Sequence, residues 1–212
     1  MTSEVFFKRI TQQYDSNLPF VVYRKPNTDD VKALLQQTNE LHFTKDFTEQ
    51  GFVFSPFDDA EYSVLIPLEL SESISISKLP VIPKFTLSGA EVKAGIHSMT
   101  KNYSTESKNF HTNLIKKGIE AIKKEAFTKV VLSRKEEVNL SETNPVSIFK
   151  KLLNQYPSAF VYCWYHPKVG LWLGATPETL IKIEGKQFSI MALAGTQNYK
   201  GSLDVIWKNK EK

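Results

Sequence analysis

The chain has 212 residues, and its 27 Lys+Arg against 23 Asp+Glu give a formal net charge of +4. Hydrophobic residues make up 41% and charged residues 24%, a mixture typical of a soluble globular protein that excludes wholesale disorder. Apolar runs such as residues 159–164 are too short to span a bilayer, and the charged N-terminal residues do not resemble a secretory signal. The single cysteine, Cys163, excludes an internal disulfide and a multi-cysteine zinc site. Together these features lead us to expect a cytoplasmic protein with no membrane partner.

The first half of the chain predicts helices and strands in alternation. Apolar residues four apart predict a helix over residues 3–14, and a β-branched and aromatic run predicts a strand over residues 20–24. We expect a second helix over residues 29–38. Two further runs predict a hairpin, formed by residues 51–57 and 62–68. The serine-rich residues 71–89, which contain two prolines, predict an internal boundary.

The second half is more regularly patterned. Ser104 can cap a helix that carries one apolar stripe of Phe110, Leu114, Ile115, Ile119 and Ile122. Asn144 followed by Pro145 is typical of a helix N-cap and first turn. The remaining runs predict a strand over residues 128–134, hairpins from 158–165 with 170–175 and from 179–184 with 187–193, and a last helix from Ser202. Antiparallel hairpins with amphipathic helices against them predict the α+β class.

Metal-ligating and basic residues are sparse. The histidines are His42, His97, His111 and His166, and only His166 lies close to the cysteine in sequence. An offset of three on a strand points Cys163 and His166 to opposite faces, so we expect no metal site there and a solvent-facing His166. The lysine pairs 116–117 and 123–124 are typical of a solvated helix face, and we expect no nucleic-acid partner.

A first chemically suggestive segment is K-V-V-L-S-R at residues 129–134. Period-two alternation places Lys129 on one face of the expected strand and Val130 on the other. Burial favours the neutral amine of a lysine, and a neutral lysine can act as a general base. The alternative, which this segment alone favours, is a lysine at a strand end that reaches solvent.

Two further segments follow. In G-A-T-P-E-T-L at residues 174–180, small residues and a proline predict a tight turn with Glu178 at its exit. Apolar neighbours there favour the protonated carboxyl group, which can donate a proton, although an exposed turn glutamate fits equally well. In L-A-G-T at residues 193–196, small residues let backbone amides approach an anion, but many strand ends look the same.

The order and separation of these three segments resemble the chorismate-utilising enzyme family, and within it the isochorismate-forming branch. The resemblance is firm over residues 104–212 and implies that family's α+β fold with chorismate as the small-molecule substrate. It divides the chain into an N-terminal α+β part, residues 1–95, and the N-terminal portion of a chorismate-binding catalytic region, residues 96–212. The product implied is isochorismate, which enters menaquinone or siderophore biosynthesis.

The resemblance also implies roles for individual residues. Lys129 deprotonates a water that attacks ring carbon 2, and Glu178 protonates the departing 4-hydroxyl group. Gly195 and Thr196 match the turn that contacts the substrate. Amine-adding members usually have glutamine in place of Lys129, and some have lysine in place of Ala194, so we expect water as the nucleophile. Salicylate-forming members share the lysine base and remain the nearest alternative.

Family members use Mg²⁺, held by glutamates in the later part of the fold. The resemblance places these ligands beyond Lys212, so we expect a chain shortened at its C-terminus that contains the proton-transfer pair without metal ligands. The alternative is an inactive fragment that serves as a binding or assembly module. Strands without partners predict self-association in either case.

Overall fold

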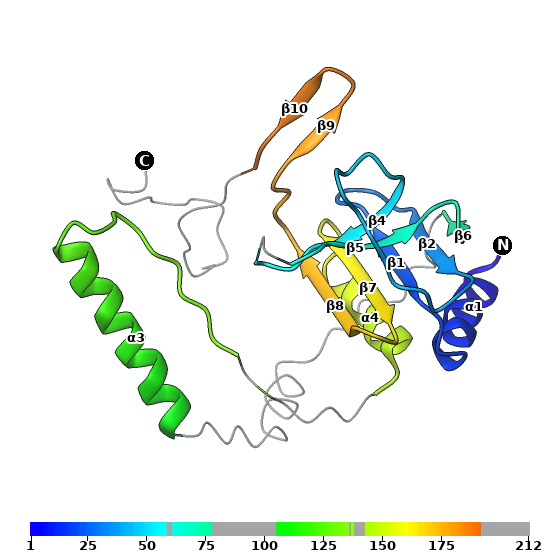
Figure 1. Ribbon diagram of the computed structural model, residues 1–212. Helices are drawn as coiled ribbons and strands as arrows, with labels where there is room; N and C mark the ends of the chain where they lie inside the picture. Colours follow the sequence, from blue (N-terminus) through cyan, green and yellow to red (C-terminus); the bar gives the residue numbers. More distant parts are fainter. Residues whose placement is uncertain (59–60, 78–104, 136, 138–142, 192–212) are drawn as a thin grey trace, which may run out of the picture. The chain divides into compact units, whose positions relative to one another are not determined.

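The computed structural model describes residues 1–58, 61–77, 105–135, 137 and 143–191. The chain divides into two units, one made of Met1–Pro83 with Glu142–Lys212 and the other of Lys84–Ser141. Among the described residues, the first unit contains the sheets and two helices, and the second contains one long helix (Figure 1). The α+β class is therefore confirmed, while the expected division at residue 95 stays a prediction.

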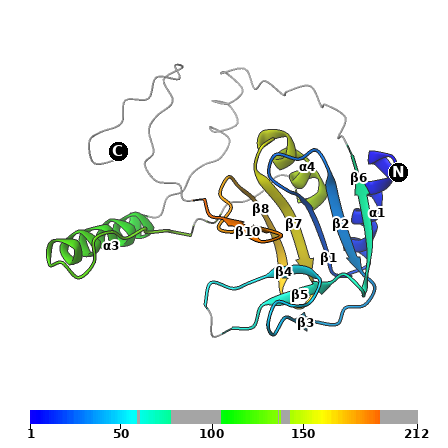
Figure 2. The same ribbon diagram turned by 90° about the horizontal axis from the view of Figure 1, so that it is seen from above.

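A five-stranded antiparallel sheet forms the centre of the first unit. Its strand order is β6-β2-β1-β7-β8, which Figure 2 shows from above. The pairing of Val22 in β1 with Cys163 in β7 joins segments that lie far apart in sequence. The strands are β1 (Phe20–Arg24), β2 (Val31–Gln36), β6 (Ser71–Ile76), β7 (Phe160–His166) and β8 (Gly170–Thr176).

Two helices, α1 (Ser3–Asp15) and α4 (Pro145–Gln155), cover one face of this sheet. Asn144 caps α4 as predicted, because its side-chain oxygen accepts hydrogen bonds from the backbone N–H groups of Val146 (2.9 Å) and Ser147 (3.1 Å). The core between the helices and the sheet includes Phe6, Ile10, Phe20, Val22, Leu35, Phe149, Leu153, Val161 and Cys163.

A buried arginine ties the sheet to the end of α4. Arg24 is only 5% exposed, and its guanidinium donates hydrogen bonds to the carbonyl groups of Leu153 (3.2 Å), Tyr156 and Ala159 (3.4 Å). The last carbonyls of a helix have no partner within the helix and carry partial negative charge. Arg24 therefore supplies hydrogen-bond donors to carbonyl groups at the C-terminal end of α4.

The other face of the five-stranded sheet is covered by a three-stranded sheet of order β3-β5-β4. Its strands are β3 (His42–Phe43), β4 (Gly51–Phe54) and β5 (Val64–Pro67). Aromatic rings fill the layer between the sheets, where Phe54 stacks on the fully buried Trp164 with ring centroids 4.6 Å apart. This layer contains Val21, Leu34, Val64, Ile66 and Trp164, flanked by Tyr23, Phe52, Phe54 and Tyr162.

Several predictions for the first half are confirmed and one is wrong. The helix over residues 3–14, the strand over 20–24 and the hairpin over 51–68 are present. Residues 29–38 contain strand β2 rather than the expected helix. The sequence did not reveal this strand, because β2 is buried on both faces and so lacks the alternation that marks a half-buried strand. The division between Pro83 and Lys84 falls within residues 71–89, as expected, although the first residues of that segment, Ser71–Ile76, form β6, which pairs with β2.

The hairpin predictions for the second half are confirmed. β7 pairs with β8, and β9 (Lys182–Glu184) pairs with β10 (Gln187–Ser189). Gly185 occupies the first position of the two-residue loop between β9 and β10 with φ +60°, a conformation that favours glycine. The last helix expected from Ser202 lies outside the described residues.

The second unit contains α3 (Thr105–Lys123), the predicted helix with the long apolar stripe. No residue of α3 is buried, and Phe110 at the start of the stripe is 71% exposed. The lysine pairs of this segment are exposed, as expected for a solvated face. None of the helices in the described part of the chain is long and apolar enough to cross a membrane.

Candidate active site

The second predicted motif begins at the end of strand β8. Gly174 pairs with Tyr162 of β7, and a Cβ atom on Gly174 would lie 2.6 Å from the Tyr162 ring. Such a distance is a clash, so a larger residue at this position would force the end of the Tyr162 ring to move. The ring of Tyr162 is itself packed against Phe54 (6.1 Å between centroids) and Phe160 (5.9 Å). The first residue of the motif is therefore fixed by packing against the aromatic layer.

The turn that follows is held by a threonine hydroxyl group. Oγ1 of Thr176 accepts a hydrogen bond from the backbone N–H of Glu178 and donates one to its carbonyl oxygen, both at 3.3 Å. Pro177 lies between them, with a fixed φ and no N–H group of its own. Beyond Glu178, the carbonyl of Thr179 accepts a hydrogen bond from the N–H of Met191 (3.2 Å). The backbone on both sides of Glu178 is thus tethered.

The side chain of Glu178 is exposed to solvent. Of the four neighbours expected to shelter it, Trp172, Leu180 and Ile181 are at least half exposed, whereas Leu173 is partly buried against the core. The described structure therefore agrees with the alternative of an exposed turn glutamate, and the acid role of Glu178 stays a prediction.

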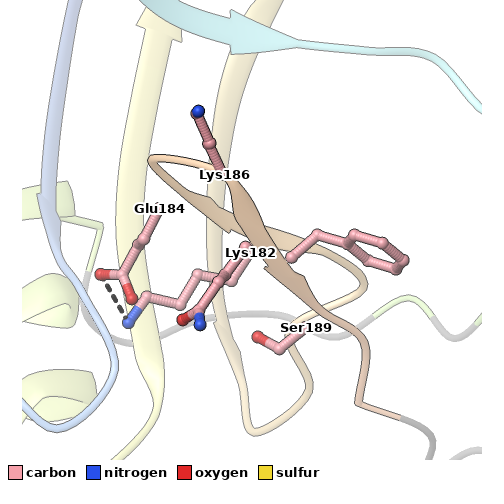
Figure 3. A pocket seen from close by; sticks show the side chains of 6 residues that line it. Lys182, Glu184, Lys186 and Ser189 are labelled. Carbon is pink, nitrogen blue, oxygen red and sulfur yellow. Dashed lines mark ion pairs between the residues drawn. The ribbon is translucent and has the colours of Figure 1, made fainter.

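An open hollow of about 550 Å³ lies on the β9–β10 hairpin, lined by Lys182, Glu184, Lys186, Gln187, Phe188 and Ser189. Figure 3 shows the ion pair between Lys182 and Glu184, with 2.9 Å between Nζ and Oε1. Both side chains are more than half exposed. Because all lining residues come from one solvent-exposed ribbon, this hollow does not enclose a ligand, and we do not assign the substrate site to it.

The first motif lies in the second unit, after α3. The alternation of side chains is as predicted, since Val130 and Leu132 approach Gly118 of α3 while Val131 is 83% exposed. However, residues 128–134 do not form the predicted strand. A strand is defined by hydrogen bonds to a neighbouring strand, and no strand among the described residues pairs with this segment.

Lys129 is exposed rather than buried on a sheet, as the alternative interpretation expected. Lys129 and Glu178 belong to different units, so the structure describes each of them separately and their pairing stays a prediction. Gly195 and Thr196, the predicted substrate-binding residues, lie outside the described residues, as does Ala194.

The cysteine and histidine of β7 point to opposite faces of the sheet, as predicted. Cys163 lies in the core beneath the helices, and burial raises the pKa of its thiol to about 12. The prediction that His166 faces solvent is wrong, because the ring is fully buried and stacks on Trp164. Its Nδ1 accepts a hydrogen bond from the N–H of Lys168 (3.1 Å), and its Nε2 lies 3.3 Å from the carbonyl oxygen of Glu40.

The family resemblance implies a Mg²⁺ ion. In the described ranges, no group of three or more His, Cys, Asp or Glu side chains could hold a metal ion. The described residues therefore do not make a magnesium site.

Two residues near the motif were not assigned a function from the sequence. The role of Tyr162 depends on its pairing with Gly174, which a sequence does not reveal until the register of the hairpin is known. The role of Thr176 could have been found from the sequence, because a threonine hydroxyl often bonds to the backbone of the residue two positions later.

The described residues define an α+β protein with helices on one face of an antiparallel sheet and a second sheet on the other. A family model with the description "Chorismate binding enzyme" matches residues 81–203, which is more than half of the 212 residues. The chain belongs to the chorismate binding enzyme family. All four predicted site residues fall within the matched range. Neither a curated protein nor a solved structure matched the chain.

Proposed function

We propose that the protein is an isochorismate synthase. The observation that carries this proposal is the residue at position 129, a lysine, within the range that matches the chorismate binding enzyme family. A lysine can accept a proton from water, whereas a glutamine at the same position has no basic atom to do so. The absence of a second lysine at Ala194 leaves water as the nucleophile we expect.

In the proposed reaction, the amine of Lys129 takes a proton from a water molecule as the water oxygen bonds to ring carbon 2 of chorismate. The ring double bonds shift, and the bond between carbon 4 and its hydroxyl oxygen breaks. The carboxyl group of Glu178 supplies the proton that lets this hydroxyl leave as water. One water enters and one leaves, so the product is an isomer of the substrate. The proton that Lys129 gains and Glu178 loses returns through solvent before the next turnover.

Lys129 and Glu178 both reach solvent in the described structure, so the proposed roles depend on bound substrate to cover them. The tethered backbone around Glu178 supports a role that requires a fixed direction, because general acid catalysis depends on the position of the donor.

The test is the product formed from chorismate, separated by liquid chromatography, with Mg²⁺ and with a chelator. We expect isochorismate as the product, and we expect the chelator to stop the reaction because we propose that the ion is required. Lys129→Gln and Glu178→Gln should each lower kcat by about a hundredfold or more. Matched controls are Lys135→Gln and Glu184→Gln, which remove exposed charges from surface ion pairs and should leave kcat unchanged.

Other products would redirect the proposal. Salicylate with pyruvate would assign the protein to the salicylate-forming branch, which shares the lysine. An aminated product formed from ammonia would contradict the role of Lys129. A wild-type protein that binds chorismate but leaves it unchanged would favour a binding or assembly module.

A further inference from the structure

The backbone around Glu178 is tethered at both ends, and the two tethers differ in kind. On the far side, the hydrogen bond from Met191 to the carbonyl of Thr179 joins two backbone groups, so side-chain changes do not remove it. On the near side, the tether is the side chain of Thr176, which bonds to both backbone groups of Glu178. The backbone of Glu178 is therefore held on this side by a side-chain hydroxyl group, which a substitution can remove.

Thr176 is well anchored for this purpose. It is the last residue of β8 and pairs with Phe160 of β7, whose ring stacks on Phe52. Because Pro177 follows, Thr176 is restricted to extended backbone conformations and Pro177 offers no N–H group. The N–H of Glu178 is thus the first donor after the strand, and the threonine hydroxyl accepts its hydrogen bond.

We propose that Thr176 is a positioning residue, which acts on the reaction by fixing the backbone of Glu178 and hence the direction of its carboxyl group. This inference rests on the proposed function, because it requires Glu178 to be the proton donor. Two hydrogen bonds to the same residue restrict both φ and ψ at Glu178, and together these angles set the direction of the Cα–Cβ bond. Loss of the hydroxyl group leaves Glu178 itself unchanged, but its carboxyl group can then point in directions that do not allow proton transfer.

The experiment compares Thr176→Val with Thr176→Ser in the full chain. Valine keeps the shape of threonine and lacks the hydroxyl group, whereas serine keeps the hydroxyl group. In Thr176→Val we expect kcat for chorismate to fall about tenfold with KM unchanged, because misdirection affects the proton transfer rather than binding. Thr176→Ser should stay within about twofold of the wild type. The control is Thr28→Val, which removes a turn hydroxyl that donates to the carbonyl of Lys25 (3.0 Å).

A second readout does not depend on activity. The amide hydrogen of Glu178, followed by NMR, should exchange about tenfold faster in Thr176→Val and at the wild-type rate in Thr176→Ser. Unchanged exchange in Thr176→Val, unchanged kcat, or equal losses of kcat in both variants would overturn the positioning role. A wild-type protein that does not convert chorismate would contradict the proposed function instead, so the two failures can be told apart.

Discussion

Helices α4 and α3 carry the same kind of amphipathic pattern and have different surroundings. α4 buries Phe149 completely against the five-stranded sheet, whereas Phe110 at the start of the α3 stripe is 71% exposed and no α3 residue is buried. A stripe of apolar residues therefore predicts a helix, but it does not predict whether that helix is buried. Burial requires another element, and β7 and β8 supply it for α4. Self-association through unpaired strands stays a prediction.

The largest effect should come from one substitution made in both helices. Phe149→Ala removes a fully buried ring and should lower the free energy of unfolding by about 3–5 kcal/mol. Phe110→Ala removes an exposed ring and should change it by less than about 0.5 kcal/mol. Urea unfolding followed by tryptophan fluorescence measures both. Equal losses in the two variants would show that α3 is covered in solution and would break the comparison.

The next effect separates a buried from an exposed arginine. Arg24→Met leaves the carbonyls of Leu153, Tyr156 and Ala159 without their donor, and should cost about 2–3 kcal/mol. Arg9→Met removes a surface pair with Glu72 and should cost less than about 1 kcal/mol. The same urea titrations measure the difference. If Arg9 proved the more important residue, the packing of α4 on the sheet would need another explanation.

A smaller effect on stability is expected where Gly174 of β8 pairs with Tyr162 of β7. Gly174→Ala places a methyl group 2.6 Å from the ring, and should cost about 1–3 kcal/mol because the ring must move. Adding Tyr162→Ala to the same chain removes the obstacle, so the double variant should lose less than the sum of the two single changes. Strict additivity in this double-mutant cycle would show that Gly174 and Tyr162 do not touch.

The smallest effect concerns pH. Burial lowers the pKa of His166, only partly opposed by the hydrogen bond to the Glu40 carbonyl and reinforced by the nearby Lys168 and His42. The unfolded chain therefore binds a proton more readily than the folded one. The contribution of His166 is fully present above the unfolded pKa of about 6.5, and it is lost as the pH falls through the lower folded value.

Substitution by a neutral side chain tests this dependence. His166→Gln keeps a donor that can reach the Glu40 carbonyl but cannot titrate, so its unfolding free energy should fall less between pH 7.5 and pH 5 than that of the wild type. His42→Gln is the control for the neighbouring histidine. An identical pH dependence in the wild type and His166→Gln would contradict the assignment.

The sequence was sufficient where local pattern decides structure. The strand at residues 20–24 was predicted to the residue, and the cap formed by Asn144 was recognised before its contacts were known. Strand β2 was missed because cover on both faces removes the alternation that distinguishes a strand from a helix. His166 was misplaced because its surroundings include distant residues, such as Glu40, whose carbonyl oxygen it contacts and which lies 126 positions earlier in the chain.

The candidate site shows the same limit. The strings around Lys129 and Glu178 could be recognised, and the family match covers both. The contact between Gly174 and Tyr162 became visible only with the register of β7 and β8, whereas the two bonds from Thr176 follow a local pattern. A sequence shows which residues have reactive side chains, but long-range strand pairing determines many of the contacts that position them.

The central claim is that this protein adds water to chorismate, with Lys129 as the base. The most direct measurement is mass spectrometry of the product formed in H₂¹⁸O. We expect isochorismate two mass units heavier than the substrate, with one ¹⁸O at carbon 2, and formation of this labelled product about a hundredfold or more slower in Lys129→Gln. Unlabelled isochorismate, or labelled product formed at the wild-type rate by Lys129→Gln, would contradict the account.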